Sequence, residues 1–362
     1  METLKGLPVA NAINEKIIEE MKDWKGAIPH LAIVRVGERP DDMSYERGAT
    51  KKMEKVGFRC TSYTFPADID NDTFQKEFDK INEDEDIDGI LLLRPLPKHL
   101  DEKAIENRIA SVKDLDGISP MNLAKVYAGD PTGYGPCTAE AVIEMLDYAG
   151  VDLKGKRAVV IGRSLVIGKP VAMMLMKKNA TVTVCHTKTV DMPGVCKGAE
   201  VLVAAAGVAK MVDKSFVADG AVVIDVGINV DEDGNLCGDV DFEDVAENAS
   251  VCTPVPGGVG SVTTSVLAKH LLKAAKARNG NNTLLLESLA IAYELTGDAS
   301  YLKYGLKTFR STLNENSGGA VGVKTVIDDA VICKGNSGKG FAQSFIPLTM
   351  YYNAVSENGM EF

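Results

Sequence analysis

Short apolar segments rich in β-branched residues alternate with longer amphipathic segments along most of this chain. The candidate strands are Leu31–Val36, Ser62–Phe65, Gly89–Leu93, Arg157–Ile161, Thr181–Cys185, Val201–Ala205, Ala221–Val226 and Val251–Pro254. The helical segments between them include Asn11–Lys25, Asp72–Asn82, Ala139–Ala149, Lys169–Lys178 and Thr264–Ala277. Strands of this kind, alternating with helices, predict an α/β fold in which helices cover both faces of parallel sheets.

The length of the chain and its polar, glycine-containing connecting segments predict two main units and a tail. At about 150 residues per domain, 362 residues indicate about two domains. We place the junction in the polar, glycine-containing segment around residue 148, so that the units are 1–148 and 149–262. The helix predicted at 264–277 is expected to pack back on the first unit, and a helical tail of unknown role fills 278–362.

Composition excludes several classes of partner. The net charge is −11, with 51 acidic and 40 basic residues and no basic block, which argues against nucleic acid or an anionic membrane as a partner. No apolar run reaches the roughly 18 residues that a membrane span needs. Seven cysteines without a Cys-x-x-Cys motif, and an N-terminus without a secretory pattern, lead us to expect a cytoplasmic protein. The four histidines are scattered, so we expect no metal site.

One strand-to-helix turn is typical of a dinucleotide site. The strand ending at Ile161 runs into Gly162, and a helical pattern starts near Gly168. Gly162 permits a tight turn, Gly168 permits close approach, and the free N–H groups at the helix start can face a pyrophosphate. The spacing is not Gly-x-Gly-x-x-Gly, so a plain strand–helix turn remains an alternative.

The end of the next strand favours NADP over NAD. An NAD site has an Asp or Glu there for the ribose hydroxyls. This chain has the run Cys185–Lys188, which contains no carboxylate. Arg163 and Lys188 can instead offset a 2′-phosphate, and Thr187 can donate a hydrogen bond to it. The alternative is that both cations are merely solvated.

Six ordered motifs carry a resemblance to a known family. They are Gly162–Pro170 (Gly-Arg-Ser-x-x-x-Gly-x-Pro), Lys113–Gly117, Gly135–Thr138, Asp225–Asn229, Gly238–Val240 and Thr253–Gly260. Over about residues 1–277 the chain resembles the methylenetetrahydrofolate dehydrogenase/cyclohydrolase family of one-carbon metabolism. The resemblance implies folate on the first unit, NAD(P) on the second, a cleft between them and a homodimer. It implies hydride transfer from 5,10-methylenetetrahydrofolate to nicotinamide, then hydrolysis of the methenyl product to 10-formyltetrahydrofolate.

The family's functional positions can be carried over one by one. Tyr45 matches the tyrosine of the family's Tyr-x-x-x-Lys motif, but Ala49 stands where the lysine belongs. Leu93 replaces the family's glutamine in the segment that begins Asp-Gly-Ile-Leu, and Asp116 matches the aspartate that holds the pterin. The resemblance thus implies two catalytic residues, Tyr45 and Asp116. It also implies contacts to substrate from Leu92, Leu93, Ser261 and Val262, the last two in place of Pro-Met, and to cofactor from Gly162, Arg163, Ser164, Gly168, Thr187, Lys188 and Ile228.

The two losses fall on the hydrolytic half of the chemistry. Hydride transfer needs mainly alignment of two carbons, which a stacked Tyr45 can support. Attack by water needs a group that takes a proton, and neither Ala49 nor Leu93 can do so. We therefore expect a dehydrogenase with weak or absent cyclohydrolase activity. Lys51 and Arg47 lie two positions from Ala49, on other helix faces. The rivals are a bifunctional enzyme that uses another base, and a non-catalytic folate or nucleotide binder.

The tail has no counterpart in that family. Residues 289–302 resemble one helical hairpin of (α/α)-toroid glycosidases and similar proteins, and 284–295 and 301–313 are predicted helices. One hairpin cannot close a toroid. A fused interaction module, a tail docked on the dehydrogenase and an accidental gene fusion all remain open.

Overall fold

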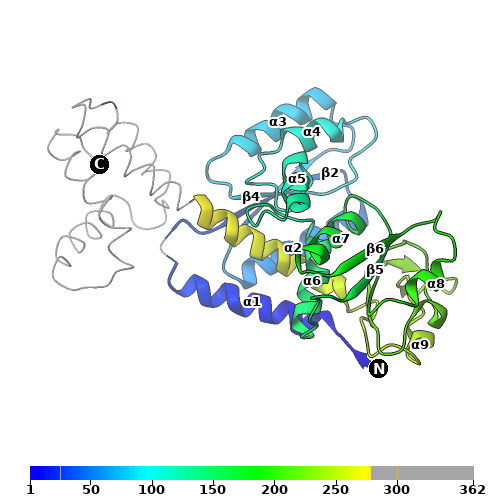
Figure 1. The fold of residues 1–362 in the computed structure, drawn as a ribbon. Helices are drawn as coiled ribbons and strands as arrows, with labels where there is room; N and C mark the ends of the chain where they lie inside the picture. The colour runs from blue at the N-terminus through cyan, green and yellow to red at the C-terminus, as the bar shows by residue number, and fades with distance from the viewer. Residues whose placement is uncertain (25, 279–299, 301–362) are drawn as a thin grey trace, which may run out of the picture.

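The computed structural model describes residues 1–24, 26–278 and 300. Within them the chain forms two parallel sheets with helices around and between them (Figure 1). The predicted α/β fold is therefore confirmed. The helical hairpin predicted in the tail lies outside the described residues. In the part of the chain that the structure describes, no helix is long and apolar enough to cross a membrane.

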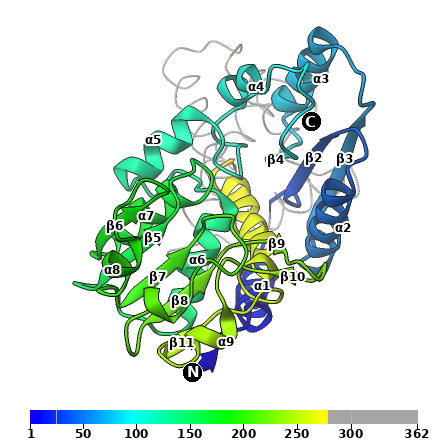
Figure 2. The same cartoon turned by 90° about the vertical axis from the view of Figure 1, so that its right-hand side faces the viewer.

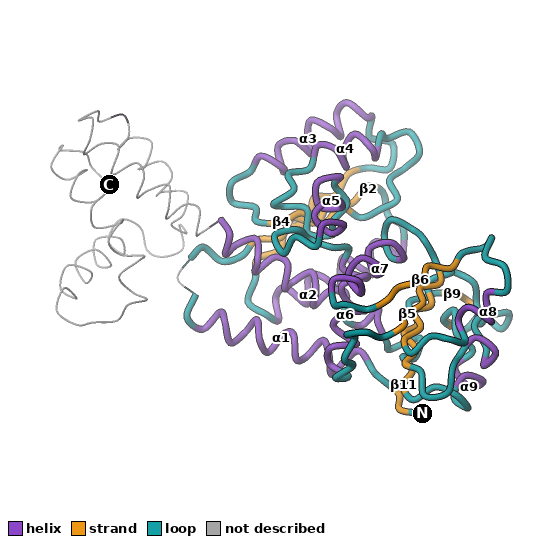
Figure 3. The backbone as a smooth tube through the Cα atoms, in the orientation of Figure 1, coloured by secondary structure: helices purple, strands orange, loops and turns teal. Residues whose placement is uncertain are grey.

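The first sheet has three parallel strands in the order β3-β2-β4. Its strands are β2 (His30–Val36), β3 (Arg59–Phe65) and β4 (Gly89–Leu92). Four helices belong to this part of the chain: α2 (Pro40–Lys55), α3 (Asn71–Glu83), α4 (Glu102–Arg108) and α5 (Pro120–Ala128). Helices α3 and α4 lie together on one side of this sheet (Figure 3).

The second sheet has six parallel strands in the order β1-β11-β8-β7-β5-β6. They are β1 (Glu2–Thr3), β5 (Arg157–Ile161), β6 (Thr181–Cys185), β7 (Val201–Ala204), β8 (Val222–Asp225) and β11 (Val251–Cys252). The strand order reverses at β5, whose neighbours are β6 and β7. In such sheets, ligands bind outside the carboxyl ends of the strands at this point. Strand β1 comes from the very start of the chain, which we had assigned to the first unit.

The remaining elements surround the second sheet or lie between the two sheets. They are α1 (Gly6–Lys22), α6 (Cys137–Tyr148), α7 (Gly168–Lys177), α8 (Met192–Cys196), α9 (Phe242–Val245), the hairpin of β9 (Asn229–Val230) and β10 (Leu236–Cys237), and single turns at Lys214–Phe216 and Val259–Ser261. Residues 263–278 are also helical. This helix runs through the centre of the molecule, between the two sheets (Figure 2).

The alternation of side chains along each strand joins the two units into one core. In β2, Leu31 and Ile33 point into a central cluster that also contains Ala158 and Val160 of β5. The intervening residues of each strand point outward into separate clusters, one under α3 and α4 and one beside α8. Successive residues of a strand face opposite sides, so each sheet has one face on the shared core. The helix at 263–278 supplies much of that core.

Candidate functional site

Tyr45 and Asp116, which lie far apart in the sequence, are brought together beside the central helix. Tyr45 projects from α2, and its phenol lies near Asp116, Cys137 and Thr263. Burial, reinforced by Cys137 and Asp116, raises the pKa of Tyr45, so the phenol stays protonated near neutral pH. Tyr45 can therefore donate a hydrogen bond or stack on a ring, but it is a poor base.

The Asp116 carboxylate is fixed by the start of α6. The backbone N–H of Cys137 donates to Asp116 Oδ1 over 2.8 Å. Burial raises the pKa of Asp116, and the Cys137 N–H and the charge of Arg94 oppose this rise. A carboxylate held in this way can accept the N–H donors of a flat heterocycle. Thr263, Arg94 and the Cys137 amide are neighbours that sequence analysis did not single out.

Apolar side chains occupy the positions of the missing lysine and glutamine, in the buried cluster against which Tyr45 packs. Ala49 is 0% exposed and Leu93 is 7% exposed, and both belong to the central cluster against which Tyr45 packs. Leu92 faces the other way, into the cluster under α3 and α4. Because no proton acceptor occupies either position, this corner of the site cannot activate water through them.

The basic residues around Ala49 point in different directions. Arg47 and Lys51, the two nearest, are both exposed. Lys52 lies three residues beyond Ala49, on the same face of α2, and is half-buried. Burial and the neighbouring Lys55 lower the pKa of Lys52. Lys52 is thus the one lysine of α2 whose placement resembles that of a replacement base.

The pair Ser261-Val262, predicted to contact the substrate, has one buried and one exposed member. Val262 is fully buried in the central cluster, whereas Ser261 is exposed. Ser261 lies close to Gly6, since a Cβ on Gly6 would come within 3.1 Å of the Ser261 Cβ. Of the Ser-Val pair, only Ser261 therefore presents surface to solvent.

The glycine turn after β5 leaves no room for a side chain at two positions. Gly162 has a φ of 126°, and a Cβ there would lie 2.2 Å from the Ala205 carbonyl oxygen. A Cβ on Gly168 would lie 2.2 Å from the Gly162 carbonyl oxygen. The Ser164 hydroxyl accepts from the Ile167 N–H over 3.1 Å and so shapes the loop that leads into α7. Only glycine fits this backbone at both positions.

The other cofactor candidates lie on neighbouring loops at the same edge of the sheet. Thr187 and Lys188 follow β6 in a tight turn, in which the His186 N–H donates to Thr189 Oγ1 over 2.9 Å. Arg163, Thr187 and Lys188 are exposed, and Ile228, after β8, is 69% exposed. Within the described residues, neither Arg163 nor Lys188 has an ion-pair partner. Two unpaired cations on the loops that follow adjacent strands form a suitable place for a phosphate.

Two buried carboxylates organise the loops at this edge. Asp239 accepts hydrogen bonds from the N–H groups of residues 206, 207 and 208 over 2.6, 3.0 and 2.9 Å, and from Asn229 Nδ2 over 2.8 Å. Asp225 accepts from the N–H groups of Gly227, Asp239 and Val240. Burial raises the pKa of Asp225 to about 6, against the effect of those hydrogen bonds. Both residues lie in sequence motifs, but nothing in the sequence reveals this role.

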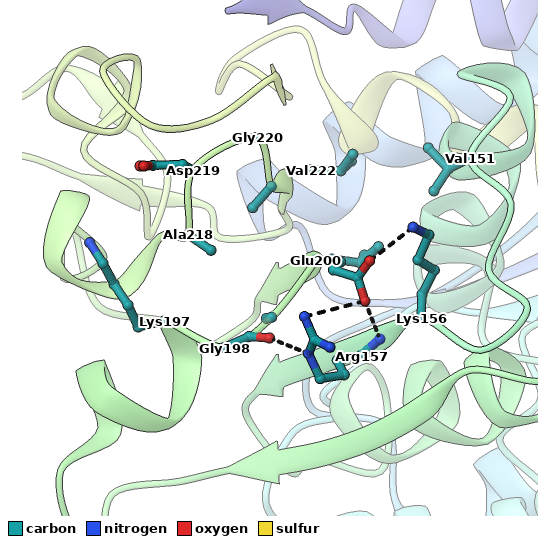
Figure 4. Close-up of a pocket in the computed structure, with 13 residues that line it drawn as sticks. Val151, Lys156, Arg157, Lys197, Gly198, Glu200, Ala218, Asp219, Gly220 and Val222 are labelled. Carbon is teal, nitrogen blue, oxygen red and sulfur yellow. Dashed lines mark hydrogen bonds and ion pairs between the residues drawn. The ribbon is translucent and has the colours of Figure 1, made fainter.

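A cavity of about 330 Å³ at the opposite edge of the second sheet lies far from these residues (Figure 4). It is near the amino ends of β5, β7 and β8, and none of the predicted site residues lines it. Its central acid, Glu200, already accepts from Lys156 Nζ over 2.8 Å and from the Arg157 N–H over 3.1 Å. Among the described residues, no group of three His, Cys, Asp or Glu side chains is arranged to hold a metal ion.

Comparison with known proteins gives a consistent picture over residues 4–279. Residues 4–116 match the family "Tetrahydrofolate dehydrogenase/cyclohydrolase, catalytic domain", and residues 136–279 match its NAD(P)-binding domain. The bifunctional protein FolD of Clostridioides difficile is 53% identical over 280 residues, which are 77% of this chain and 98% of that protein.

Two solved structures are similar over the same part of the chain. The bifunctional FolD of Campylobacter jejuni is 36% identical, with a TM-score of 0.73, over 77% of this chain and 99% of that one. The enzyme from Trypanosoma brucei, described as complexed with NADP cofactor and inhibitor, is 36% identical, with a TM-score of 0.71, over 76% of this chain and 97% of that one.

Proposed function

The chain belongs to the tetrahydrofolate dehydrogenase/cyclohydrolase family, and from this membership we propose that it oxidises 5,10-methylenetetrahydrofolate to 5,10-methenyltetrahydrofolate with NADP. Residues 1–148, with the helix at 264–277, carry the folate in this proposal, and residues 149–262 carry the NADP. Relatives at about half identity are named as bifunctional enzymes. The product serves one-carbon metabolism.

Hydride transfer, the first step, requires little of the protein beyond alignment of the two reacting carbons. When bound, NADP supplies the nicotinamide that accepts a hydride from the methylene carbon of the substrate. The C–H bond breaks with both its electrons, and the lone pair of the adjacent nitrogen forms the C=N bond of the methenyl cation. No proton leaves, so no general base is needed. Tyr45 orients the substrate ring, and Asp116 holds the pterin.

We further propose that cyclohydrolase activity is weak or absent. The observation that carries this proposal is the burial of Ala49 and Leu93 in the apolar cluster beside Tyr45. Hydrolysis of the methenyl cation requires water to lose a proton as it attacks carbon, and a positioned base contributes about 10²- to 10⁴-fold to such a step. A full bifunctional enzyme is the second candidate, because Lys52 lies on the same helix face, half-buried.

A two-wavelength assay separates these activities. Purified protein receives methylenetetrahydrofolate with NADP or NAD, and reduced cofactor and methenyl product are followed separately. We expect the two to accumulate in parallel, faster with NADP. Reduced cofactor without methenyl accumulation would show that hydrolysis is intact, and Lys52→Met would then test the alternative base. No cofactor reduction at all would leave only the non-catalytic binder.

We also propose a homodimer in the cytoplasm. Strand β6 is at the edge of the second sheet, and Thr181, Thr183 and Val184 are exposed along it. An uncovered edge strand can pair with a second copy of itself. The six described cysteines are all free thiols, in keeping with a reducing compartment. Light scattering of the purified chain tests the dimer, for which twice the mass of one chain is expected.

A further inference from the structure

His270 is a buried histidine that the proposed chemistry does not use. It projects from the helix at 263–278, and it is 2% exposed. Its Nδ1 lies 2.7 Å from the carbonyl oxygen of Leu115, the residue directly before Asp116. Its Nε2 lies 2.8 Å from Glu140 Oε2, in the first turn of α6. The side chain thus joins three segments that meet behind the folate site.

Both partners of the ring can only accept hydrogen bonds. A backbone carbonyl has no proton to donate, and neither does an ionised carboxylate. Burial works to raise the pKa of Glu140, but His270 and Lys269 outweigh it and hold that pKa well below its ordinary value. Lys269 Nζ bonds Glu140 Oε1 over 2.8 Å. Glu140 is therefore a carboxylate, and each ring nitrogen of His270 faces an acceptor.

The imidazole of His270 lies near the groups that hold Asp116. Cys137 Sγ lies 3.9 Å from His270 Nδ1, and the Cys137 N–H is the group that donates to Asp116 Oδ1. The ring of Tyr134 packs edge-on against the imidazole, with 5.4 Å between centroids. His270 therefore contacts the residue before Asp116 and lies next to the residue that holds its carboxylate.

The rest of this loop has its own anchor. Asp114 accepts from the N–H groups of Ile118 and Ser119 over 3.0 and 2.8 Å, and from Asn122 Nδ2 over 2.9 Å. These bonds fix the loop on the far side of Asp116. On the near side, the Leu115 carbonyl accepts from His270 and from the weak thiol donor of Cys137, 3.6 Å away. Of the two side chains on the Leu115 carbonyl, the imidazole is the closer and the stronger donor.

We propose that His270 is a positioning residue for folate binding, and that its two nitrogens have separable tasks. Nδ1–H holds the Leu115 carbonyl and thereby orients Asp116 toward the pterin. Nε2–H ties the central helix to the first turn of α6. The inference rests on the proposed function for the identity of the ligand. His270 does not touch the substrate.

The matched variants His270→Asn and His270→Gln separate the two tasks. The amide nitrogen of Asn reaches the place of Nδ1, and that of Gln reaches the place of Nε2. We measure tetrahydrofolate binding by calorimetry, together with kcat and KM. For His270→Asn we expect the folate Kd and KM to stay within about threefold of wild type. For His270→Gln we expect both to rise about tenfold or more, with kcat nearly unchanged, since a lost charge-assisted bond commonly costs that much.

The NADP KM and the thermal midpoint distinguish positioning from a general structural role. Both are expected to be similar in the two variants, and folate affinity alone should differ. Equal folate Kd values in Asn and Gln variants, raised or unchanged, would overturn the proposal. If neither variant folds, Glu140→Gln provides the test, because it keeps the bond from His270 Nδ1 to the Leu115 carbonyl. We then expect the folate Kd to stay within about threefold of wild type. A tenfold rise in that Kd would overturn the proposal. A wild-type protein that binds tetrahydrofolate but reduces no cofactor would refute the proposed function alone.

Discussion

At the scale of single residues, we propose that the site retains what hydride transfer needs and lacks the two groups that the family uses for hydrolysis. Tyr45 and Asp116 meet beside the central helix, whereas Ala49 and Leu93 add only apolar surface. These two substitutions were readable from the sequence, because each falls within an otherwise matching motif. The surroundings that decide their effect, including Thr263 and the half-buried Lys52, come from parts of the chain that only the fold brings near.

The double variant Ala49→Lys/Leu93→Gln is expected to gain cyclohydrolase activity. A lysine at position 49 would enter the buried corner beside Tyr45, where low polarity lowers its pKa toward neutrality. We expect the decay of methenyltetrahydrofolate absorbance to accelerate about 10²-fold or more over wild type. Glu54→Lys, which places a lysine on the exposed face of the same helix, is the control. A double variant no faster than this control would show that the two positions are not the cause of the loss.

The unpaired cations predict the cofactor preference. Replacing both Arg163 and Lys188 with alanine removes the charges that we assign to the 2′-phosphate. We expect the NADP KM to rise about tenfold or more, because charge-assisted bonds are lost, and the NAD KM to change little. Steady-state kinetics with both cofactors measures the difference. Lys154→Ala, an exposed lysine near the start of β5, should change neither value. Equal effects on NADP and NAD would refute the assignment.

At the scale of elements, burial decides what sequence could predict. Strands β5 and β6 begin and end where their apolar, β-branched runs predicted. Helix α5 was missed because its apolar residues do not face the core: Met121 is 57% and Tyr127 78% exposed, and Asn122 is its one buried residue. Its exposed apolar residues therefore do not mark a face that packs on the core. The short hairpin of β9 and β10 was missed as well, since two-residue strands leave no periodic pattern.

Asp239 illustrates an element-scale role that sequence cannot reveal, since three of its four donors lie 31 to 33 residues away in the loop after β7. Both oxygens of Asp239 face donors, so an amide nitrogen in Asp239→Asn would face another N–H. We expect a loss of about 1–3 kcal/mol in the free energy of unfolding and a higher NADP KM. Chemical denaturation and kinetics measure the two effects. Asp233→Asn, in the exposed turn of the nearby hairpin, is the control and should change neither. An Asp239→Asn protein as stable as this control would contradict the organising role.

At the scale of the whole molecule, the two units share one hydrophobic core, and the central helix at 263–278 packs between them. Residues of β2, α2, α6, β5 and the helix at 263–278 belong to a single apolar cluster. The proposed division at residue 148 leaves the hydrophobic interior continuous, and β1 joins the second sheet from the other side of that division. The far end of this helix is tied to the first sheet by Arg278, whose Nε lies 3.0 Å from Asp88 Oδ1 and whose Nη1 donates to the Glu85 carbonyl over 2.7 Å.

Because of the contact between Arg278 and Asp88, the free energy of unfolding depends on pH. Burial raises the pKa of Asp88 to about 6, and Arg278 partly opposes the rise. Because the folded-state pKa lies above the ordinary value of 3.8, the folded state binds a proton more readily than the unfolded state. This group therefore adds stability as pH falls through about 6. At higher pH its charged form is stabilised by Arg278 and by the His30 N–H, which donates to Asp88 Oδ2 over 2.9 Å.

In the full chain, Arg278→Gln should lower the free energy of unfolding by about 1.5–3 kcal/mol at pH 8, where Asp88 is charged. At pH 5 the loss should be much smaller, because Asp88 is then mostly neutral. Denaturant unfolding at the two pH values measures both effects, and Arg278→Lys, which keeps the charge, should recover most of the loss. In an Asp88→Asn background the arginine substitution should cost much less and equally at both pH values, because only the bond to the Glu85 carbonyl is then lost. A loss of equal size at both pH values, or one that survives undiminished in that background, would mean that the ion pair does not couple the central helix to the first sheet.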